Sequence, residues 1–403
     1  MKKIIATTLM VAASAVVASS TETELARKLP QIFADSAANY ALLEREALKL
    51  MVDDKGKNRT PHGWIKKDRR LDMRNIYWWT SGHFPGALWY LYEATGDEAW
   101  KTRAVKWTEI LAPVADYTGN HDIGFMMYCS YGNARRILKT DKYDSLLLRA
   151  AESLSKRYNE KLGIIRSWGN ISDNKDFVVI PDNMMNLELM EWASKKSGND
   201  KYAKIARSHS DKTMIHHYRA DGGCRHVLNY DQRNGRVQQI LRGQGASCET
   251  AWSRGQSWSI YGYAMMARET GDKRYLDFAM KLADFAINHP NMPKDGIPYW
   301  DYGAPGEERD SSAGSIMASG LLELSQLVGG EKGAGYRAFA VKQLLTLSSD
   351  EYFAKGDEVG GFVLKHGVGH KPCGGEIDVP LDYGDYYYFE ALLRFSKIFK
   401  AGK

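Results

Sequence analysis

Thr270-Gly271-Asp272-Lys273-Arg274-Tyr275 joins two segments of helical periodicity, and related stretches recur along the chain. The other copies are Gly96-Asp97-Glu98-Ala99-Trp100, Thr140-Asp141-Lys142-Tyr143, Gly198-Asn199-Asp200-Lys201-Tyr202 and a weaker Gly329-Gly330-Glu331-Lys332-Gly333-Ala334-Gly335-Tyr336. Glycine ends one helix in the left-handed conformation, aspartate caps the next helix, and the aromatic residue begins its apolar stripe. The pattern predicts tight helix–helix turns that repeat at a spacing typical of helical hairpins stacked in series.

Two kinds of helix alternate around these turns. The first kind is rich in small residues, which allow helices to crowd around a centre, and its copies start near residues 80, 122, 182, 253, 311 and 385. The second kind is conventionally amphipathic and starts near residues 30, 98, 142, 200, 272 and 334. We therefore predict an all-α fold, an (α/α)6 barrel of six inner and six outer helices.

The N-terminal segment has the pattern of a secretory signal peptide. A basic start, Met1-Lys2-Lys3, precedes an apolar run to Val17 and then small residues. We expect cleavage after Ala18 and export to the periplasm, because the run is too short for a comfortable membrane span. No linker-like composition divides the rest of the chain, so we expect residues 1–18 to be removed and residues 19–403 to form a single catalytic domain.

Composition narrows the classes of partner and cofactor. The net charge of +6 is compatible with an anionic substrate, although ordinary surface balance explains it equally well. We expect neither a nucleic-acid nor a membrane partner, and the oligomeric state stays open. The four cysteines show no metal-ligand spacing, so we expect no metal. Cys224 and Cys248 flank a predicted β-hairpin and are a candidate disulfide, whereas Cys129 is expected to be a core residue.

Asp122 and Asp182 are the candidate catalytic residues. Each lies where a polar loop meets the N-terminus of an inner helix. Because the inner helices run in one direction, these two aspartates and the long loops gather on one face of the barrel, a common place for a binding site. Two neighbouring carboxylates can hold different protonation states at one pH. The alternative is that both are ordinary helix N-caps.

Other residues of the predicted mouth have two interpretations each. Arg254 could grip a carboxylate in bidentate fashion or form a surface salt bridge. Trp168 could stack on a sugar ring or anchor its loop, and His121 could titrate near neutrality or hydrogen-bond a loop carbonyl. The stretch 224–240, with a turn at Asn234-Gly235, is predicted to be a β-hairpin within a mouth loop.

Three long motifs and the C-terminal ending resemble the unsaturated glucuronyl hydrolases, glycoside hydrolase family 88. These stretches are His121-Asp122-Ile123-Gly124-Phe125, Asp182-Asn183-Met184-Met185-Asn186-Leu187, Ala251-Trp252-Ser253-Arg254-Gly255-Gln256-Ser257-Trp258 and Gly384-Asp385-Tyr386-Tyr387-Tyr388-Phe389-Glu390-Ala391-Leu392. The resemblance runs from about residue 30 to the C-terminus. The loop from His366 to Tyr383 departs most from the family pattern, which leaves substrate selection beyond the first sugar open.

The resemblance implies roles for individual residues. Asp182 is the expected catalytic acid/base and Asp122 its essential partner. The residues expected to bind the first sugar are His121, Trp168, His226, Gln244, Arg254, Trp258 and Trp79, with Trp78 competing for the last of these positions.

The activity that the resemblance implies is hydration of a 4,5-unsaturated uronic acid at the non-reducing end of a lyase-generated, glycosaminoglycan-type oligosaccharide. No cofactor is implied. The alternatives are an unsaturated galacturonyl hydrolase acting on pectin fragments, a non-catalytic sugar-binding barrel and an ordinary inverting glycosidase.

Overall fold

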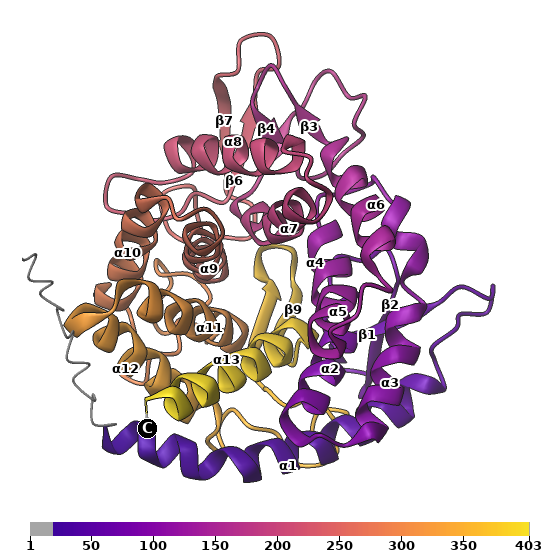
Figure 1. The fold of residues 1–403 in the computed structure, drawn as a ribbon. Coiled ribbons are helices and arrows are strands. Elements are labelled where there is room, and N and C mark those ends of the chain that lie inside the picture. The colour runs from indigo at the N-terminus through magenta and orange to yellow at the C-terminus, as the bar shows by residue number, and fades with distance from the viewer. Residues whose placement is uncertain (1–18, 403) are drawn as a thin grey trace, which may run out of the picture.

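The computed structural model describes residues 19–402, in which helices alternate between an inner and an outer ring (Figure 1). The inner ring contains α2 (His83–Thr95), α4 (Ile123–Met127) continued by η2 (Tyr128–Gly132) and α5 (Asn133–Leu138), α7 (Leu187–Ser197), α9 (Ser253–Thr270), α11 (Ser311–Val328) and α13 (Asp382–Ala401). The outer ring contains α1 (Ser20–Leu48), α3 (Glu98–Glu109), α6 (Asp144–Ser155), α8 (Lys201–His216), α10 (Lys273–Asn288) and α12 (Gly330–Leu347). The predicted (α/α)6 barrel is confirmed.

The short inner-to-outer turns have the predicted chemistry. Gly96, Gly198 and Gly271 end their helices with φ values of 72°, 69° and 68°, in the left-handed region. The side chains of Asp97 and Asp272 then cap α3 and α10 by accepting backbone N–H groups.

Small residues in the inner helices allow close backbone approach. A Cβ atom on Gly262 of α9 would lie 2.4 Å from Cβ of Met184, and one on Gly320 of α11 would lie 3.0 Å from Cα of Tyr261. Every residue of α9 from Ser253 to Ala267 is buried. Glycine and serine therefore set the diameter of the inner ring, as the sequence pattern predicted.

Two features differ from the sequence-based expectation. Helix α1 begins at Ser20, about ten residues before the predicted start near 30, and its first turn carries a capping box formed by Ser19 and Glu22. The predicted signal peptide, residues 1–18, lies outside the described residues. Small sheets are also more numerous than the single predicted hairpin.

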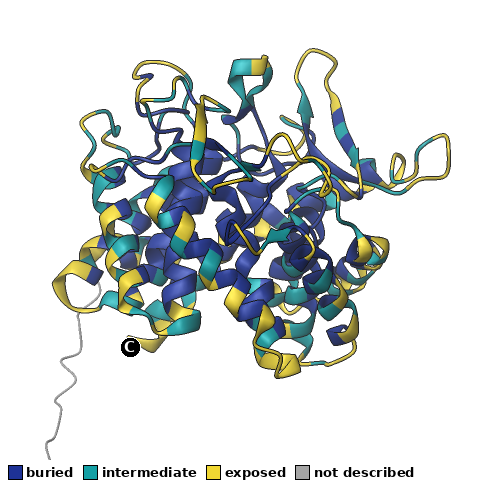
Figure 2. Ribbon diagram, turned by 90° about the horizontal axis from the view of Figure 1, so that it is seen from above, coloured by how far each residue is buried: buried dark blue, intermediate teal, exposed yellow. Residues whose placement is uncertain are grey.

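The strands lie in the long loops at one end of the barrel, opposite the end where the chain finishes (Figure 2). The predicted hairpin is present as β6 (Val227–Tyr230) and β7 (Val237–Leu241), and β5 (Val178–Val179) pairs with β6. The unpredicted antiparallel pairs are β1 (Arg59–Ile65) with β2 (Arg70–Asn75), β3 (Tyr158–Asn159) with β4 (Ile164–Ile165), and β8 (Gly367–His370) with β9 (Gly375–Val379).

The remaining short helices are η1 (Ala112–Asp116), η3 (Pro181–Asn186) and η4 (Lys371–Cys373). Across residues 19–402, no helix combines the length and apolar character that crossing a membrane requires.

All four cysteines lie within this range and are free, so the candidate Cys224–Cys248 disulfide is not formed. Cys129 is buried in η2, as expected of a core residue.

Candidate active site

Asp122 lies at the mouth end of the barrel, immediately before α4, with 14% of its side chain exposed. Burial raises the pKa of Asp122 to about 8, and the negative charge of Asp182 adds to this effect. The Asn186 amide and the Arg157 guanidinium act in the opposite direction. A carboxyl group in this environment keeps its proton at neutral pH.

Asp182 is the second residue of η3 and is 7% exposed. Burial raises its pKa to about 7, while the positive charge of Arg254 and the indole N–H of Trp258 lower it. Its Oδ2 atom makes no hydrogen bond to the described residues. The charge of Asp182 couples the two carboxyl groups, because it contributes to the raised pKa of Asp122.

Neither aspartate serves as a helix cap. Asp122 occupies the N-cap position of α4 but makes no capping hydrogen bond, and η3 is preceded by Ile180 at its N-cap position. A buried carboxylate is costly when it lacks such a role. The arrangement therefore favours the chemical interpretation of the pair over the capping alternative.

His226 faces Asp182 across the site. Its Nδ1 atom accepts a hydrogen bond of 2.8 Å from the backbone N–H of Gln244, and its Nε2 atom lies 3.6 Å from Oδ2 of Asp182. Burial and the charge of Arg254 lower the pKa of His226 well below its usual range. The imidazole is therefore neutral, carries its hydrogen on Nε2, and presents that N–H to Asp182.

Arg254 is buried at the start of α9, but its two terminal nitrogens are already engaged. Nη1 donates to the carbonyl of Val368 and lies 3.4 Å from Asp310, and Nη2 donates to the carbonyl of Gly369 at 2.8 Å. Only Nε has no partner among the described residues. The surface salt bridge is wrong, because Arg254 is buried and its ion pair with Asp310 is buried as well. The bidentate grip on a substrate carboxylate stays a prediction, since Nε and one hydrogen of Nη2 are not used by the described residues. Arg254 acts on Asp182 through its charge.

His121 does not titrate near neutrality as the sequence suggested. It is 1% exposed, and burial together with the Arg157 charge lowers its pKa well below the usual range. Its Nε2 atom lies 3.3 Å from Oδ1 of Asp122. The ring of His121 is therefore neutral and contacts the carboxyl group of Asp122 without adding a positive charge beside it.

Aromatic residues form the floor and the rim of the site. Trp258 is fully buried, with its ring centroid 5.1 Å from that of Phe125. Trp79 packs on Phe125 at 5.6 Å and on Tyr383 at 4.9 Å, so it is Trp79 that contacts the segment following Asp122. Trp78 instead stands 5.8 Å from the ring of His62.

Trp168 lies at the rim. It is 42% exposed, and the residue before it, Ser167, accepts the backbone N–H of His121 at 2.9 Å. This backbone contact places the Trp168 segment beside the Asp122 segment. An exposed indole near two carboxyl groups is suited to stacking on a sugar.

Two residues that shape the site, Asn186 and Arg157, were not predicted from the sequence. Asn186 accepts the N–H of Phe125 at 2.8 Å and sends its amide toward Asp122, so it bridges η3 and α4. Arg157 is 2% exposed, and its positive charge reaches Asp122. Asn186 was within a quoted motif, but Arg157 had no local signal because its position depends on the packing of distant loops.

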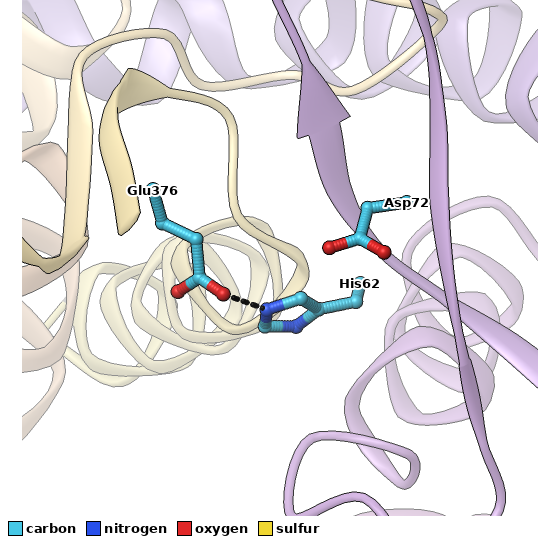
Figure 3. A group of neighbouring side chains, drawn as sticks. All are labelled: His62, Asp72 and Glu376. Carbon is cyan, nitrogen blue, oxygen red and sulfur yellow. Dashed lines mark hydrogen bonds and ion pairs between the residues drawn. The ribbon is translucent and has the colours of Figure 1, made fainter. Parts of the chain in front are cut away.

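One group of side chains in the described part of the chain has a donor set suited to a cation. His62, Asp72 and Glu376 offer ligand atoms that all lie within 4.8 Å of one another (Figure 3). Arg74 competes for the same carboxylates, with Nη2 2.6 Å from Asp72 and 4.0 Å from Glu376. A guanidinium at this distance supplies the positive charge that a metal ion would otherwise supply.

Comparisons with known proteins agree with the site. The chain is 40% identical over 362 residues to an unsaturated glucuronyl hydrolase of Formosa agariphila, covering 88% of this chain and 89% of that protein. It is 32% identical over 340 residues to an unsaturated chondroitin disaccharide hydrolase of Streptococcus pyogenes serotype M1, covering 82% and 84%. A crystal structure of an unsaturated glucuronyl hydrolase specific for heparin matches with a TM-score of 0.84 at 41% identity, covering 92% and 98%. No protein-family model matches the chain.

Proposed function

The chain belongs to the unsaturated glucuronyl hydrolases, glycoside hydrolase family 88, and on that premise we propose that Asp182 and Asp122 hydrate the double bond of an unsaturated uronic acid. The substrate is an anionic oligosaccharide, of glycosaminoglycan type, whose non-reducing end carries a 4,5-unsaturated uronic acid. A polysaccharide lyase generates such ends. Release of that terminal sugar makes the protein a glycoside hydrolase.

The first step is proton transfer to the alkene. Asp182, held in its protonated form by burial, gives its proton to C4 of the substrate, and positive charge develops at C5 and the ring oxygen. The Nε2–H of His226 faces the carboxylate that this step leaves behind. An N–H donor stabilises that carboxylate, because hydrogen bonds to a charged acceptor are stronger than those to a neutral one.

The second step adds water at C5. Asp182, now ionised, accepts a proton from the attacking water, which returns the carboxyl group to its starting state. The resulting hemiketal opens and releases the remaining sugar. Since the anomeric carbon is not displaced directly, the separation of the carboxyl groups does not predict retention or inversion.

Arg254 links substrate binding to this proton transfer. Its charge lowers the pKa of Asp182 in the free protein. A substrate carboxylate close to Arg254 offsets that charge, so the pKa of Asp182 rises in the complex and the acid form is retained for the first step. We propose Nε, which lacks a protein partner, as the atom that meets the substrate.

The observation that carries the proposal is the buried pair of carboxyl groups with raised pKa values at the mouth of the barrel. A panel of lyase-generated disaccharides from chondroitin, heparin and pectin tests it, with loss of the alkene absorbance as the readout. Consumption of a glucuronyl-type disaccharide is expected. Consumption of the pectin-derived substrate alone would favour the galacturonyl alternative, and an unchanged absorbance throughout would favour a non-catalytic sugar-binding barrel.

We also propose export to the periplasm, which rests on the basic and apolar pattern of residues 1–18. The expected mature protein starts at residue 19. N-terminal sequencing of the protein recovered from a periplasmic fraction tests both the cleavage site and the compartment.

A further inference from the structure

His62 of β1 is a buried histidine that lies between carboxylates from two other segments. Its Nε2 atom is 2.8 Å from Oε1 of Glu376 in β9 (Figure 3), and its Nδ1 atom is 3.5 Å from Oδ1 of Asp382 in α13. Burial alone would lower the pKa of His62, but these two carboxylates raise it to about 10. The side chain is therefore an imidazolium at neutral pH.

The charges around His62 are nearly balanced. The positive groups are His62 and Arg74, and the negative groups are Glu376, Asp72 and Asp382. The charges of His62, Arg254 and Arg74 lower the pKa of Glu376 to about 2, although burial opposes this. The cluster is thus a salt-bridge network between β1, β2, β9 and α13. Its positive charges come from the side chains of His62 and Arg74.

Glu376 is packed tightly against β8. A Cβ atom on Gly369 would lie 1.8 Å from Oε2 of Glu376, so only glycine leaves room for this carboxylate. Glu376 itself has a φ of 56°, a left-handed conformation that is uncommon outside glycine and is kept only when the surroundings enforce it. The His62–Glu376 pair is such a constraint.

The strand that Glu376 touches holds two residues of the active site. The carbonyl of Gly369 accepts Nη2 of Arg254 at 2.8 Å and Nε2 of Gln244 at 2.9 Å. The backbone N–H of Gln244 in turn fixes the ring of His226, which faces Asp182. One carbonyl oxygen therefore contacts both Arg254 and Gln244, and helps to fix their positions.

We propose that His62 and Glu376 are positioning residues, which hold the β8–β9 hairpin so that the Gly369 carbonyl orients Arg254 and Gln244 for substrate binding. Neither residue needs to touch the substrate for this role. The inference rests on the proposed hydrolase function, because it assigns Arg254 and Gln244 to the substrate. It adds two residues that act through others: His62 from β1, and Glu376 from the loop between His366 and Tyr383.

Glu376→Ala tests the proposal with the disaccharide that the wild-type protein consumes best. Loss of the His62–Glu376 ion pair is expected to displace Arg254 and Gln244. KM should therefore rise about tenfold while kcat stays within about threefold. A rise in KM alone indicates lost ground-state binding. The matched control is Lys66→Gln, which removes an exposed 2.7 Å ion pair with Asp378 between the same two hairpins. The control is expected to leave both constants unchanged.

Glu376→Gln is the second variant, since it preserves shape and a hydrogen bond from His62 but removes the charge. Nuclear magnetic resonance titration of the His62 imidazole should show protonation through pH 9 in the wild-type protein and deprotonation at lower pH in the variant. This readout needs no substrate. A failure of the proposed hydrolase function therefore leaves the ion pair itself testable.

Three results would overturn the inference. The first is a Glu376→Ala protein with unchanged KM, and the second is a fall in kcat alone. The third is a loss of activity on treatment with a chelator, followed by recovery when Zn²⁺ is added. That result would make His62, Asp72 and Glu376 metal ligands instead of members of a salt-bridge network.

Discussion

The Nε2 atom of His226 lies 3.6 Å from Oδ2 of Asp182, and both atoms lack a closer hydrogen-bonding partner among the described residues. The neutral imidazole has its hydrogen on that nitrogen, because Nδ1 already accepts the N–H of Gln244. An acid and a neutral donor are thus held face to face at slightly more than hydrogen-bond distance. When Asp182 loses its proton, the contact becomes a charge-assisted one.

The first prediction concerns Asp182→Asn. The amide has the same shape and cannot give or take the proton, so kcat is expected to fall at least about a hundredfold, the low end of general acid/base contributions. The fold is expected to persist, because Asp182 caps no helix. Steady-state loss of alkene absorbance, together with far-ultraviolet circular dichroism, measures both effects.

The control for this experiment is Asp200→Asn. Asp200 precedes α8, makes no capping hydrogen bond and has 73% of its side chain exposed. Its variant should keep the wild-type kcat. A folded Asp182→Asn protein with near-normal turnover would remove Asp182 from the mechanism.

The second prediction concerns Asp122→Asn and the pH–rate profile. The negative charge of Asp182 helps raise the pKa of Asp122, and the repulsion acts equally in the other direction. Removing one carboxyl group should lower the apparent pKa of the basic limb, together with a loss of rate. Profiles of kcat and kcat/KM measure this, and an unchanged basic limb at unchanged turnover would reduce Asp122 to a structural residue.

Stability provides an independent test of the same residue. The pKa of Asp122 is raised from an unfolded value near 3.9 to about 8, so the folded state binds more protons than the unfolded state in that interval. Asp122 therefore lowers the free energy of unfolding of the wild-type protein progressively as pH rises from about 4 to about 8. The Asp122→Asn variant should gain Tm relative to the wild type at pH 8 and show little gain at pH 4. A Tm difference that is constant with pH would contradict the raised pKa.

The sequence predicted the barrel because its signals are local and repeated. Gly271 and Asp272 specify a turn by their own conformational and capping preferences, and the turn recurs. The aspartate pair was also predictable, since each member lies at a loop–helix junction on the same face. The role of Arg254 was harder to predict, because Val368 and Gly369, which occupy its guanidinium, lie more than a hundred residues away in sequence.

Small sheets in the loops were the least predictable part of the fold. Strands of two residues, such as β3 and β4, are too short to show a period of two. The His62–Glu376 contact spans 314 residues and joins the β1–β2 and β8–β9 hairpins. Pairings of this kind depend on the barrel bringing distant loops together, which no sequence pattern in either loop indicates.

The third prediction tests the contact between the two catalytic segments. A Cβ atom on Gly124 of α4 would lie 2.5 Å from Cα of Asn186, a backbone atom that cannot move aside cheaply. Gly124→Ala is expected to lower the free energy of unfolding by about 1–3 kcal/mol, as overpacking in a core does. It should also lower turnover, because η3 carries Asp182. Chemical denaturation and the absorbance assay measure the two effects.

Gly335→Ala is the control for Gly124→Ala. Gly335 lies in α12, and a Cβ atom there meets nothing within 4 Å. Alanine should leave activity unchanged and stabilise the helix by up to about 1 kcal/mol. If both alanine variants were equally stable and active, the crossing of α4 and η3 would not require glycine.

The last prediction concerns Trp168 at the rim. Because Trp168 is 42% exposed and no aromatic ring among the described residues pairs with it, Trp168→Ala should leave Tm nearly unchanged. If the indole stacks on the substrate sugar, its removal costs about 0.5–1.5 kcal/mol of binding, which raises KM about two- to tenfold while kcat stays within about twofold. Ile171→Ala is the matched control, since Ile171 is 46% exposed in the same loop. Equal KM values for the two variants would show that Trp168 only anchors its loop. Recovery of the wild-type KM in Trp168→Phe would show that the substrate contacts the aromatic face of the side chain.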